Sequence, residues 1–245
     1  MNNKTKQYII ENIKTIFFAL VIAVIIRSLF IQPFYIPSSS MEPTLLVGDR
    51  IFVSKYNYGY SKHSFPFSPP VYNKRLLNKS PNRGDLVVFK TPADNRTDYI
   101  KRLIGLPGDT VQFVNGDLIL NNELIEKKKK NLDLIIRCGK GNYEVNFFEE
   151  ILPNGVEYLA AYRKNGSMQN TEKYIVPRNH FFFLGDNRDC SKDSRFLNSV
   201  GYVKNINLVG KAQFIFFSND SYKGSLLKFW NLKNSFRFNR LFKKL

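Results

Sequence analysis

The longest uninterrupted apolar stretch of the chain lies near its start. Residues 16–26 are all apolar, and the apolar pattern continues to Ile31. Residues 15–31 are just long enough for a membrane-spanning helix, and Arg27 near the end can extend its charge to the interface. Because no small-x-small cleavage site follows, the pattern favours an uncleaved anchor over a removable signal peptide.

The charges around this apolar stretch predict its orientation. Lys4, Lys6 and Lys14 precede it, whereas residues 32–49 contain no lysine or arginine. The positive-inside rule therefore places residues 1–14 in the cytoplasm and everything after residue 32 on the exported side, as a single-pass protein.

Beyond residue 33 the pattern changes to short β-type runs separated by Gly, Pro and Asn. Asn115-Gly116 lies between two of these runs and predicts a two-residue hairpin turn. Many short strands with such turns predict a β-sandwich or barrel-like body. The predicted strands are 50–55, 85–90, 99–105, 110–114, 117–120, 143–148, 157–162, 180–184 and 209–217.

Two segments between these strands have unusual compositions. Residues 56–82 are rich in Tyr, Ser, Phe and Pro, which predicts a long exposed loop or ribbon. This segment is either a simple surface excursion or a loop whose aromatic residues enter the membrane interface. Residues 127–130 are four lysines, which we interpret as a solvated charge run between strands.

The overall charge indicates a polyanionic partner. The 245 residues carry a formal net charge of +17, which attracts nucleic acid or anionic lipid. Residues 221–245 contain basic residues interleaved with apolar ones and no acidic residue, a pattern that suits an anionic lipid surface. An exported domain would meet little nucleic acid, so we expect lipid to be the partner. Cys138 and Cys190 allow one disulfide bridge or none.

The candidate chemistry centres on a serine rather than on a histidine. Ser40 follows the apolar stretch closely, and there is neither a Gly-x-Ser-x-Gly elbow nor a metal-ligand cluster. His63 lies in the aromatic loop, and His180 opens an apolar strand where we expect a partly buried structural role. A serine can instead be activated by a neutral lysine.

Lys101 is the candidate for that lysine. In a strand, Lys101 shares one face with Tyr99 and Leu103, while Ile100 and Arg102 face the other way. Apolar neighbours lower the pKa of a lysine, because the charged form loses hydration. A fall of about 3 units from about 10.4 corresponds to about 4 kcal/mol of differential solvation.

Four segments in a fixed order carry a resemblance to a known family. They are Ser-Ser-Ser-Met-Glu-Pro-Thr-Leu (38–45), Gly-Asp-Leu-Val-Val-Phe-Lys (84–90), Tyr-Ile-Lys-Arg-Leu-Ile-Gly-Leu-Pro-Gly-Asp (99–109) and Gly-Asp-Asn-Arg-Asp-Cys-Ser-Lys-Asp-Ser-Arg (185–195). Following an N-terminal anchor, they closely resemble bacterial type I signal peptidase, the membrane-bound leader peptidase. The resemblance spans roughly residues 15–55 and 83–220, and Cys190 departs from the usual small polar residue.

The resemblance implies a role for each matching residue. It makes Ser40 the nucleophile and Lys101 the general base, with the Ser38 hydroxyl and the Ser40 backbone N–H forming the oxyanion hole. Ser191 would orient the lysine amine. Asp193 and Arg195 would support its loop, and the substrate cleft would be lined by Ile36, Pro37, Tyr99 and Ile100. The resemblance implies neither a metal nor another cofactor.

The resemblance also implies the architecture and the substrates. The expected fold is mainly β: a transmembrane helix, then an all-β catalytic core of residues 32–114 and 177–220. A smaller inserted β-domain would occupy residues 115–176, and residues 221–245 would form the basic tail. The substrates would be exported preproteins with small residues, usually alanine, at the first and third positions before the cut. The long aromatic loop and the lack of a transit peptide favour the inner membrane of a Gram-negative bacterium.

Two alternative functions remain beside signal-peptide cleavage. A serine–lysine autoprotease of the repressor-cleaving type would need an internal Ala-Gly or similar site before the serine and no spanning helix, and neither feature is seen. A catalytically inactive, membrane-tethered binding protein is disfavoured because Ser40, Lys101 and Ser191 are all intact.

Overall fold

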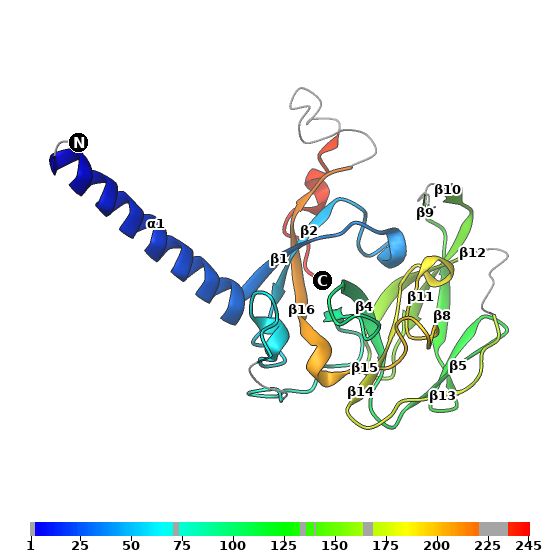
Figure 1. The fold of residues 1–245 in the computed structure, drawn as a ribbon. Coiled ribbons are helices and arrows are strands. Elements are labelled where there is room, and N and C mark those ends of the chain that lie inside the picture. Colours follow the sequence, from blue (N-terminus) through cyan, green and yellow to red (C-terminus); the bar gives the residue numbers. More distant parts are fainter. Residues whose placement is uncertain (1–2, 71–73, 133–135, 140, 164–168, 221–234) are drawn as a thin grey trace.

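The protein consists of one long N-terminal helix and a body made almost entirely of strands (Figure 1). The computed structural model describes residues 3–70, 74–132, 136–139, 141–163, 169–220 and 235–245. The helix α1 (Asn3–Leu29) extends away from the body, and its side chains are exposed almost throughout. Within the described residues, it is the one helix long and apolar enough to cross a membrane.

The helix boundaries differ from the predicted span of residues 15–31. α1 begins at Asn3, because helical hydrogen bonding continues through polar residues as readily as through apolar ones. It ends at Leu29, and Ile31 is the first residue of strand β1, where it pairs with Ser54. The hydrophobic pattern therefore located the apolar part of the helix but not its ends.

The largest sheet has seven strands and carries the site described below. Its order is β1-β2-β16-β3-β4-β14-β15, and all of its pairings are antiparallel. β1 was not predicted, since it continues directly from the apolar run and contains Pro33, which an edge strand tolerates. The strands are β1 (Ile31–Tyr35), β2 (Asp49–Ser54), β16 (Leu208–Ser218), β3 (Leu86–Lys90), β4 (Asp98–Gly105), β14 (His180–Leu184) and β15 (Val203–Lys204).

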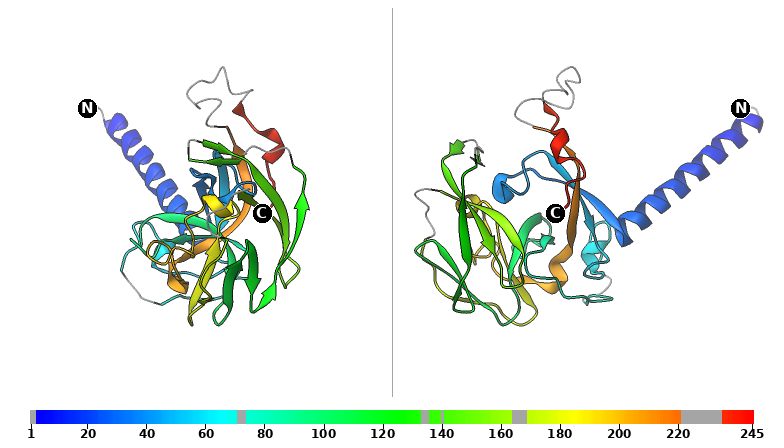
Figure 2. Two further views of the ribbon diagram at one scale, coloured as in Figure 1. Left: turned by 90° about the vertical axis from the view of Figure 1, so that its right-hand side faces the viewer. Right: turned by 180° about the vertical axis from the view of Figure 1, so that it is seen from behind.

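Three smaller sheets lie beside the large one (Figure 2). The four-stranded sheet contains β13 (Tyr174–Ile175), β5 (Thr110–Val114), β6 (Asp117–Leu120) and β7 (Glu123–Leu124), in that order. The three-stranded sheet contains β12 (Glu157–Arg163), β11 (Val145–Ile151) and β8 (Glu126–Lys130). A final pair is formed by β10 (Gly141–Tyr143) and β9 (Ile136–Cys138).

The predicted hairpin at Asn115-Gly116 is confirmed. Val114 pairs with Asp117 across the turn, and the two central residues have φ of 51° and 81°. A positive φ at both positions is the geometry that favours Asn-Gly. β5 thus pairs with β6 and β13 and not with the large sheet, so a boundary at residue 114 would cut this hairpin. The division into a core and an inserted part remains a prediction.

Two strand predictions need correction. Residues 127–130 do not link strands: they belong to β8, which pairs with β11 at the edge of its sheet. Lysines suit this place because charged side chains discourage a second molecule from adding to an edge. The predicted strand 143–148 is two strands, β10 and β11, and β11 continues to Ile151.

The aromatic segment 56–82 is only partly exposed. Tyr58, Ser61, His63 and Ser64 are buried, and Ser61–Ser64 form a capped 3₁₀ turn, η2 (Lys62–Ser64). Buried polar side chains need partners, and this segment supplies them locally. Phe67, in contrast, is fully exposed. The prediction of an exposed loop is therefore wrong for the segment's first part, and residues 71–73 lie outside the described residues.

The C-terminal residues 235–245 pack against the body, although the sequence suggested that they belong to a basic tail suited to a lipid surface. The Phe242 N–H donates to the Ile215 carbonyl, and Leu245 is tied in the same way to Gln213. The Arg240 guanidinium is buried and forms an ion pair with Asp49 at 2.6 Å. A buried carboxylate requires such a partner, which the composition of the tail did not reveal. Residues 221–234 of the predicted tail lie outside the described residues.

Candidate active site

Ser40 is held by the short turn that follows β1. The segment enters the body at Ile36, which is buried and hydrogen-bonded to Asp49, and then forms the 3₁₀ turn η1 (Ser39–Met41). Met41 and Leu45 are completely buried just beyond Ser40. Apolar anchors on both sides therefore fix the serine against the large sheet.

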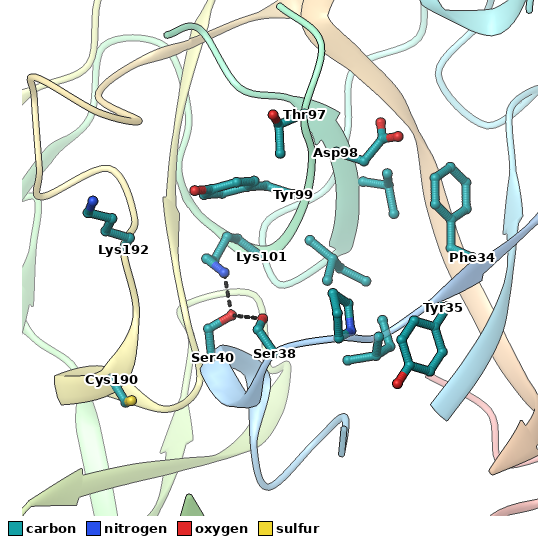
Figure 3. Close-up of a pocket in the computed structure, with 14 residues that line it drawn as sticks. Phe34, Tyr35, Ser38, Ser40, Thr97, Asp98, Tyr99, Lys101, Cys190 and Lys192 are labelled. Carbon is teal, nitrogen blue, oxygen red and sulfur yellow. Dashed lines mark hydrogen bonds between the residues drawn. The ribbon is translucent and has the colours of Figure 1, made fainter. Parts of the chain in front are cut away.

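Lys101 reaches Ser40 from the middle of the large sheet. It lies in β4, where it pairs with Val87 of β3, and only 4% of the residue is exposed. Its Nζ donates to Ser40 Oγ over 2.5 Å, and Figure 3 shows the amine pointing directly at that oxygen. The same amine lies 5.4 Å from the centre of the Tyr99 ring. The predicted sharing of a face by Tyr99 and Lys101 agrees with this geometry.

Burial lowers the pKa of the Lys101 amine. Loss of hydration lowers the pKa of Lys101 to about 8, and the charges of Asp193 and then Asp186 limit the fall. A lysine with this pKa is neutral in about one molecule in ten at pH 7, whereas a free lysine is neutral in about one in 2,500. The neutral amine can accept a proton from the serine hydroxyl.

Ser38 lies on the cleft side of the same turn. Its Oγ is 3.3 Å from Ser40 Oγ, and Figure 3 shows the two hydroxyls side by side. Ser38 is extended, with φ of −124° and ψ of 153°, and directly precedes η1. A hydroxyl at this distance can turn its hydrogen towards an oxygen bound next to Ser40.

The segment 185–195 packs against the backbone of Ser40. A Cβ at Gly185 would collide with Ser191 Oγ and with the Ser40 carbonyl oxygen, so only glycine permits this approach. Asp193 accepts hydrogen bonds from the Gly185 N–H at 3.0 Å and from Arg195 Nε at 2.8 Å. Burial alone would raise the pKa of Asp193, but the Arg195 charge and these hydrogen bonds hold it below the usual range.

Ser191 is buried in the same cluster, but its predicted contact with the lysine is not formed. Its Oγ has no hydrogen-bond partner among the described residues. The hydroxyl lies against Gly185, beside the Ser40 carbonyl oxygen, and is not bonded to Lys101.

A second buried ion pair, which the sequence did not reveal, joins three of the quoted segments. Arg102 binds Asp186 through two hydrogen bonds of 2.8 and 2.6 Å, and Thr44 Oγ1 donates to the same carboxylate at 2.6 Å. All three residues lie inside the segments 38–45, 99–109 and 185–195. Their positions were visible in the sequence, but their pairing requires the fold.

Asn187 and a disulfide bridge complete the attachment of η1. The Asn187 backbone N–H donates to the Ser40 carbonyl at 3.2 Å, and its side-chain amide donates to the Ser39 carbonyl at 3.0 Å. Cys138 and Cys190 form a disulfide that ties β9 to η3 (Arg188–Cys190), immediately before Ser191. This resolves the choice between one bridge and none.

A cavity of about 360 Å³ opens in front of Ser40 and Lys101. Its lining is largely apolar and comes from β1, the turn after it and β4, as Figure 3 shows. The four residues that the sequence assigned to the substrate cleft, Ile36, Pro37, Tyr99 and Ile100, all line it. Phe34, Tyr35, Val88 and Lys192, which the sequence did not indicate, line it as well.

Neither histidine belongs to this site. His180 is only partly buried at the start of β14, where its Nδ1 lies 2.9 Å from the Arg178 carbonyl oxygen. His63 is buried in η2 and lines a different cavity. The described residues contain no cluster of three or more His, Cys, Asp or Glu that could hold a metal ion.

Comparison with known proteins agrees with this geometry. The family profile described as signal peptidase, peptidase S26, matches residues 9–217. Signal peptidase I of Rickettsia bellii is 39% identical over 100% of this chain and 87% of its own length. Signal peptidase I of Rickettsia typhi is 38% identical over 100% of this chain and 97% of its own length.

A crystal structure of a signal peptidase I from Enterococcus faecalis V583 is 27% identical and covers 54% of this chain and 97% of that chain. Its TM-score of 0.32 is too low to bear on the fold or the site. The family profile and the Rickettsia relatives each extend over most of the chain. The chain therefore belongs to the signal peptidase family, peptidase S26, and is a serine endopeptidase.

Proposed function

We propose that this endopeptidase removes N-terminal signal peptides from exported preproteins, with Ser40 as the nucleophile and Lys101 as the general base. The observation that carries the proposal is the 2.5 Å hydrogen bond between Lys101 Nζ and Ser40 Oγ, two buried residues at the base of the cavity. A nucleophile within hydrogen-bond reach of a base is the arrangement that activates a serine.

The proposed reaction follows from these two groups. Neutral Lys101 takes the hydroxyl proton as Ser40 Oγ attacks the scissile carbonyl carbon, and the lysine becomes charged. It then donates that proton to the nitrogen of the leaving peptide, which leaves an acyl group on Ser40. A water molecule, activated by the same amine, hydrolyses the ester and restores the serine.

Ser38 and the Ser40 backbone N–H are the proposed donors to the oxyanion. The negative charge develops on the substrate carbonyl oxygen, which lies next to Ser40 Oγ during the attack. Ser38 Oγ is 3.3 Å from Ser40 Oγ. Removing one such donor costs about 3 kcal/mol of transition-state stabilisation in comparable sites. The Asp193–Arg195 ion pair is proposed to support the loop that carries Ser191, whose hydroxyl makes no hydrogen bond to Lys101 in this structure.

The cavity supports a preference for small residues next to the cut. Ile36, Ile100 and Val88 line the same cavity as Ser40, and branched side chains of this kind exclude bulky substrate residues by steric overlap. Alanine at the first and third positions before the cut suits such a site.

Membership of the signal peptidase family and the long apolar helix α1 together indicate a membrane-anchored protein. We infer that residues 1–14 lie in the cytoplasm and that the catalytic body works on the exported side of the inner membrane. The lysines at the start of α1 support this orientation. A substrate held in the same bilayer would then meet the site at a raised local concentration. Anionic lipid is the expected surface for a chain of charge +17.

The test is cleavage of a purified preprotein by full-length variants in detergent. We expect Ser40→Ala and Lys101→Ala each to abolish cleavage, because each removes one of the two reacting groups. Lys101→Arg should be equally inactive, since arginine stays protonated. His180→Ala serves as the control and should cleave normally. Near-normal turnover by either alanine variant at Ser40 or Lys101 would rule the pair out.

A further inference from the structure

A second cavity, of about 310 Å³, lies where α1 meets the body. Two contacts join this region to the helix end: the Tyr60 hydroxyl donates to the Leu29 carbonyl at 2.9 Å, and the Lys55 N–H donates to the Phe30 carbonyl at 3.0 Å. Figure 1 shows the cyan segment that contains η2 beside the end of α1. The cavity shares Phe34 and Asp98 with the catalytic cleft, so the two lie next to each other.

The lining of this cavity carries an excess of positive charge. It includes Arg27, Lys55, Lys90 and Arg96 but a single carboxylate, Asp98. That carboxylate forms an ion pair with Lys90 at 2.9 Å. Among the described residues, neither Arg27 nor Arg96 forms an ion pair. Lys55 is buried and donates to a neutral group, the carbonyl of Ser64, at 2.5 Å.

One buried nitrogen in the lining of this cavity, on His63, also lacks a hydrogen-bond partner within the residues that the structure describes. His63 lines it and is only 5% exposed, and its Nδ1 lies 3.0 Å from Ser68 Oγ. Its Nε2 is buried without a partner in the described part of the chain. Burial and then nearby cations, Lys62 foremost, lower the pKa of His63 to about 4, so the ring is neutral. A neutral ring whose Nδ1 accepts from Ser68 carries its proton on Nε2 and can donate it.

The pKa of Lys55 also reflects the excess of positive charge in this cavity. Burial lowers this pKa to about 8, and the positive charge of Arg27 adds to this fall, whereas the Asp98 charge opposes it only in part. A buried cation without a carboxylate is costly unless an anion neutralises it. An oxyanion in the cavity would accept from Lys55, Arg27 and Arg96 together, as phosphate does from clustered basic groups.

The position of the cavity identifies the source of that anion. Arg27 lies in the last turn of α1, at the level where a spanning helix leaves the hydrocarbon and meets lipid headgroups. The fully exposed Phe67 side chain lies in the same lining and suits insertion beside the headgroups. We propose that this cavity, the headgroup pocket, binds the phosphate group of an anionic phospholipid.

The headgroup pocket would fix the body relative to the bilayer. One lipid phosphate held at the end of α1 ties the helix, β4 and η2 to a defined depth, and the cleft opens beside it. This inference goes beyond peptide cleavage but rests on the proposed membrane-spanning α1. Lipid binding is measured without preprotein, so its outcome does not depend on whether Ser40 and Lys101 carry the reaction.

The test is titration of the delipidated full chain, in detergent, with dioleoylphosphatidylglycerol, followed by native mass spectrometry. The variant is the double substitution Arg27→Gln with Arg96→Gln, because both side chains are exposed and their loss should not disturb folding. The matched control is Lys129→Gln with Lys204→Gln, which removes two exposed charges elsewhere.

We expect the first lipid to bind about fivefold more weakly for each cation removed, and so about 25-fold more weakly to the double variant. The control should bind as the wild type does. Glycerol 3-phosphate and inorganic phosphate should bind far more weakly than the lipid. Equal binding by the double variant, an equal loss in the control, or binding of a soluble phosphate as tight as that of the lipid would each overturn the proposal.

Discussion

Asp193 is the carboxylate that does most to keep charge on Lys101. Burial lowers the pKa of the lysine to about 8, and the Asp193 charge opposes that fall more strongly than the Asp186 charge does. Asp193 is itself held in its charged form by Arg195. The protonation of the proposed base is therefore set by a balance between dehydration and a carboxylate on a different segment.

This balance predicts the pH dependence of cleavage. Because the neutral lysine is the active form, kcat/KM should rise as the pH increases through about 8 and then level off. Asp193→Asn removes a charge that favours the protonated lysine, so the midpoint of the rise should move to lower pH. The pH at the midpoint of the rise is the quantity to compare. The absolute rate is unsuitable, because the variant also leaves Arg195 without its ion-pair partner.

Asp94→Asn is the control for this shift, because Asp94 is exposed and its hydrogen bonds are to neighbouring residues. Its profile should match that of the wild type. A flat profile between pH 6 and 10, or a midpoint that moves upward in Asp193→Asn, would contradict a lysine base.

The same burial predicts a cost in stability. The folded state binds Lys101's proton less tightly than the unfolded state, so between pH about 8 and 10.5 the unfolded state holds more protons. The penalty is complete below pH 8 and disappears as the pH rises through this window. It amounts to about 3 kcal/mol.

Lys101→Met should therefore raise the free energy of unfolding at pH 7 by up to about 3 kcal/mol while it abolishes cleavage. Denaturant unfolding of the full chain in detergent, at pH 7 and at pH 10.5, measures this. The gain should shrink at the higher pH. Ser40→Ala controls for the loss of the hydrogen bond alone, and a gain of the same size at both pH values would show that dehydration is not its cause.

The sequence predicted the parts of the site but not the way they are joined. Motif order brought Ser40, Lys101 and Asp193 to attention, and the strand pattern correctly put Lys101 beside Tyr99. The pairing of Arg102 with Asp186 was not predicted, because it links residues 84 positions apart. Such contacts depend on the packing of strands, which hydrophobic patterns do not specify.

The fold errors have a similar origin. Hydrophobic alternation found the long strands of the large sheet, and the Asn-Gly turn gave the β5–β6 hairpin. It missed β1 and β8, whose exposed edges are tolerant of proline and lysine. Charge composition likewise suggested a basic tail for a lipid surface, whereas Arg240 is buried against Asp49 because that carboxylate needs a partner.

The disulfide between Cys138 and Cys190 should contribute strongly to stability. It joins residues 52 positions apart, and closing a loop of that length restricts the unfolded chain. Replacing both cysteines by serine should lower the free energy of unfolding by about 2–4 kcal/mol. Reduction of the wild type should produce the same loss and leave the double variant unchanged. If denaturant unfolding gives equal midpoints with and without reductant, the bridge contributes nothing.

The last prediction concerns substrate choice. Ile100 lines the cleft next to Lys101 and also packs against the core cluster that contains Val88. Ile100→Ala should widen the cleft, so a peptide with valine in place of the alanine before the cut should gain about tenfold in kcat/KM relative to the alanine peptide. The ratio is the useful quantity, because any loss of folded enzyme affects both peptides equally. Ile175→Ala makes the same change at an exposed position of β13 and should leave the ratio as it is. An unchanged ratio in Ile100→Ala would mean that other cleft residues set the preference for small side chains.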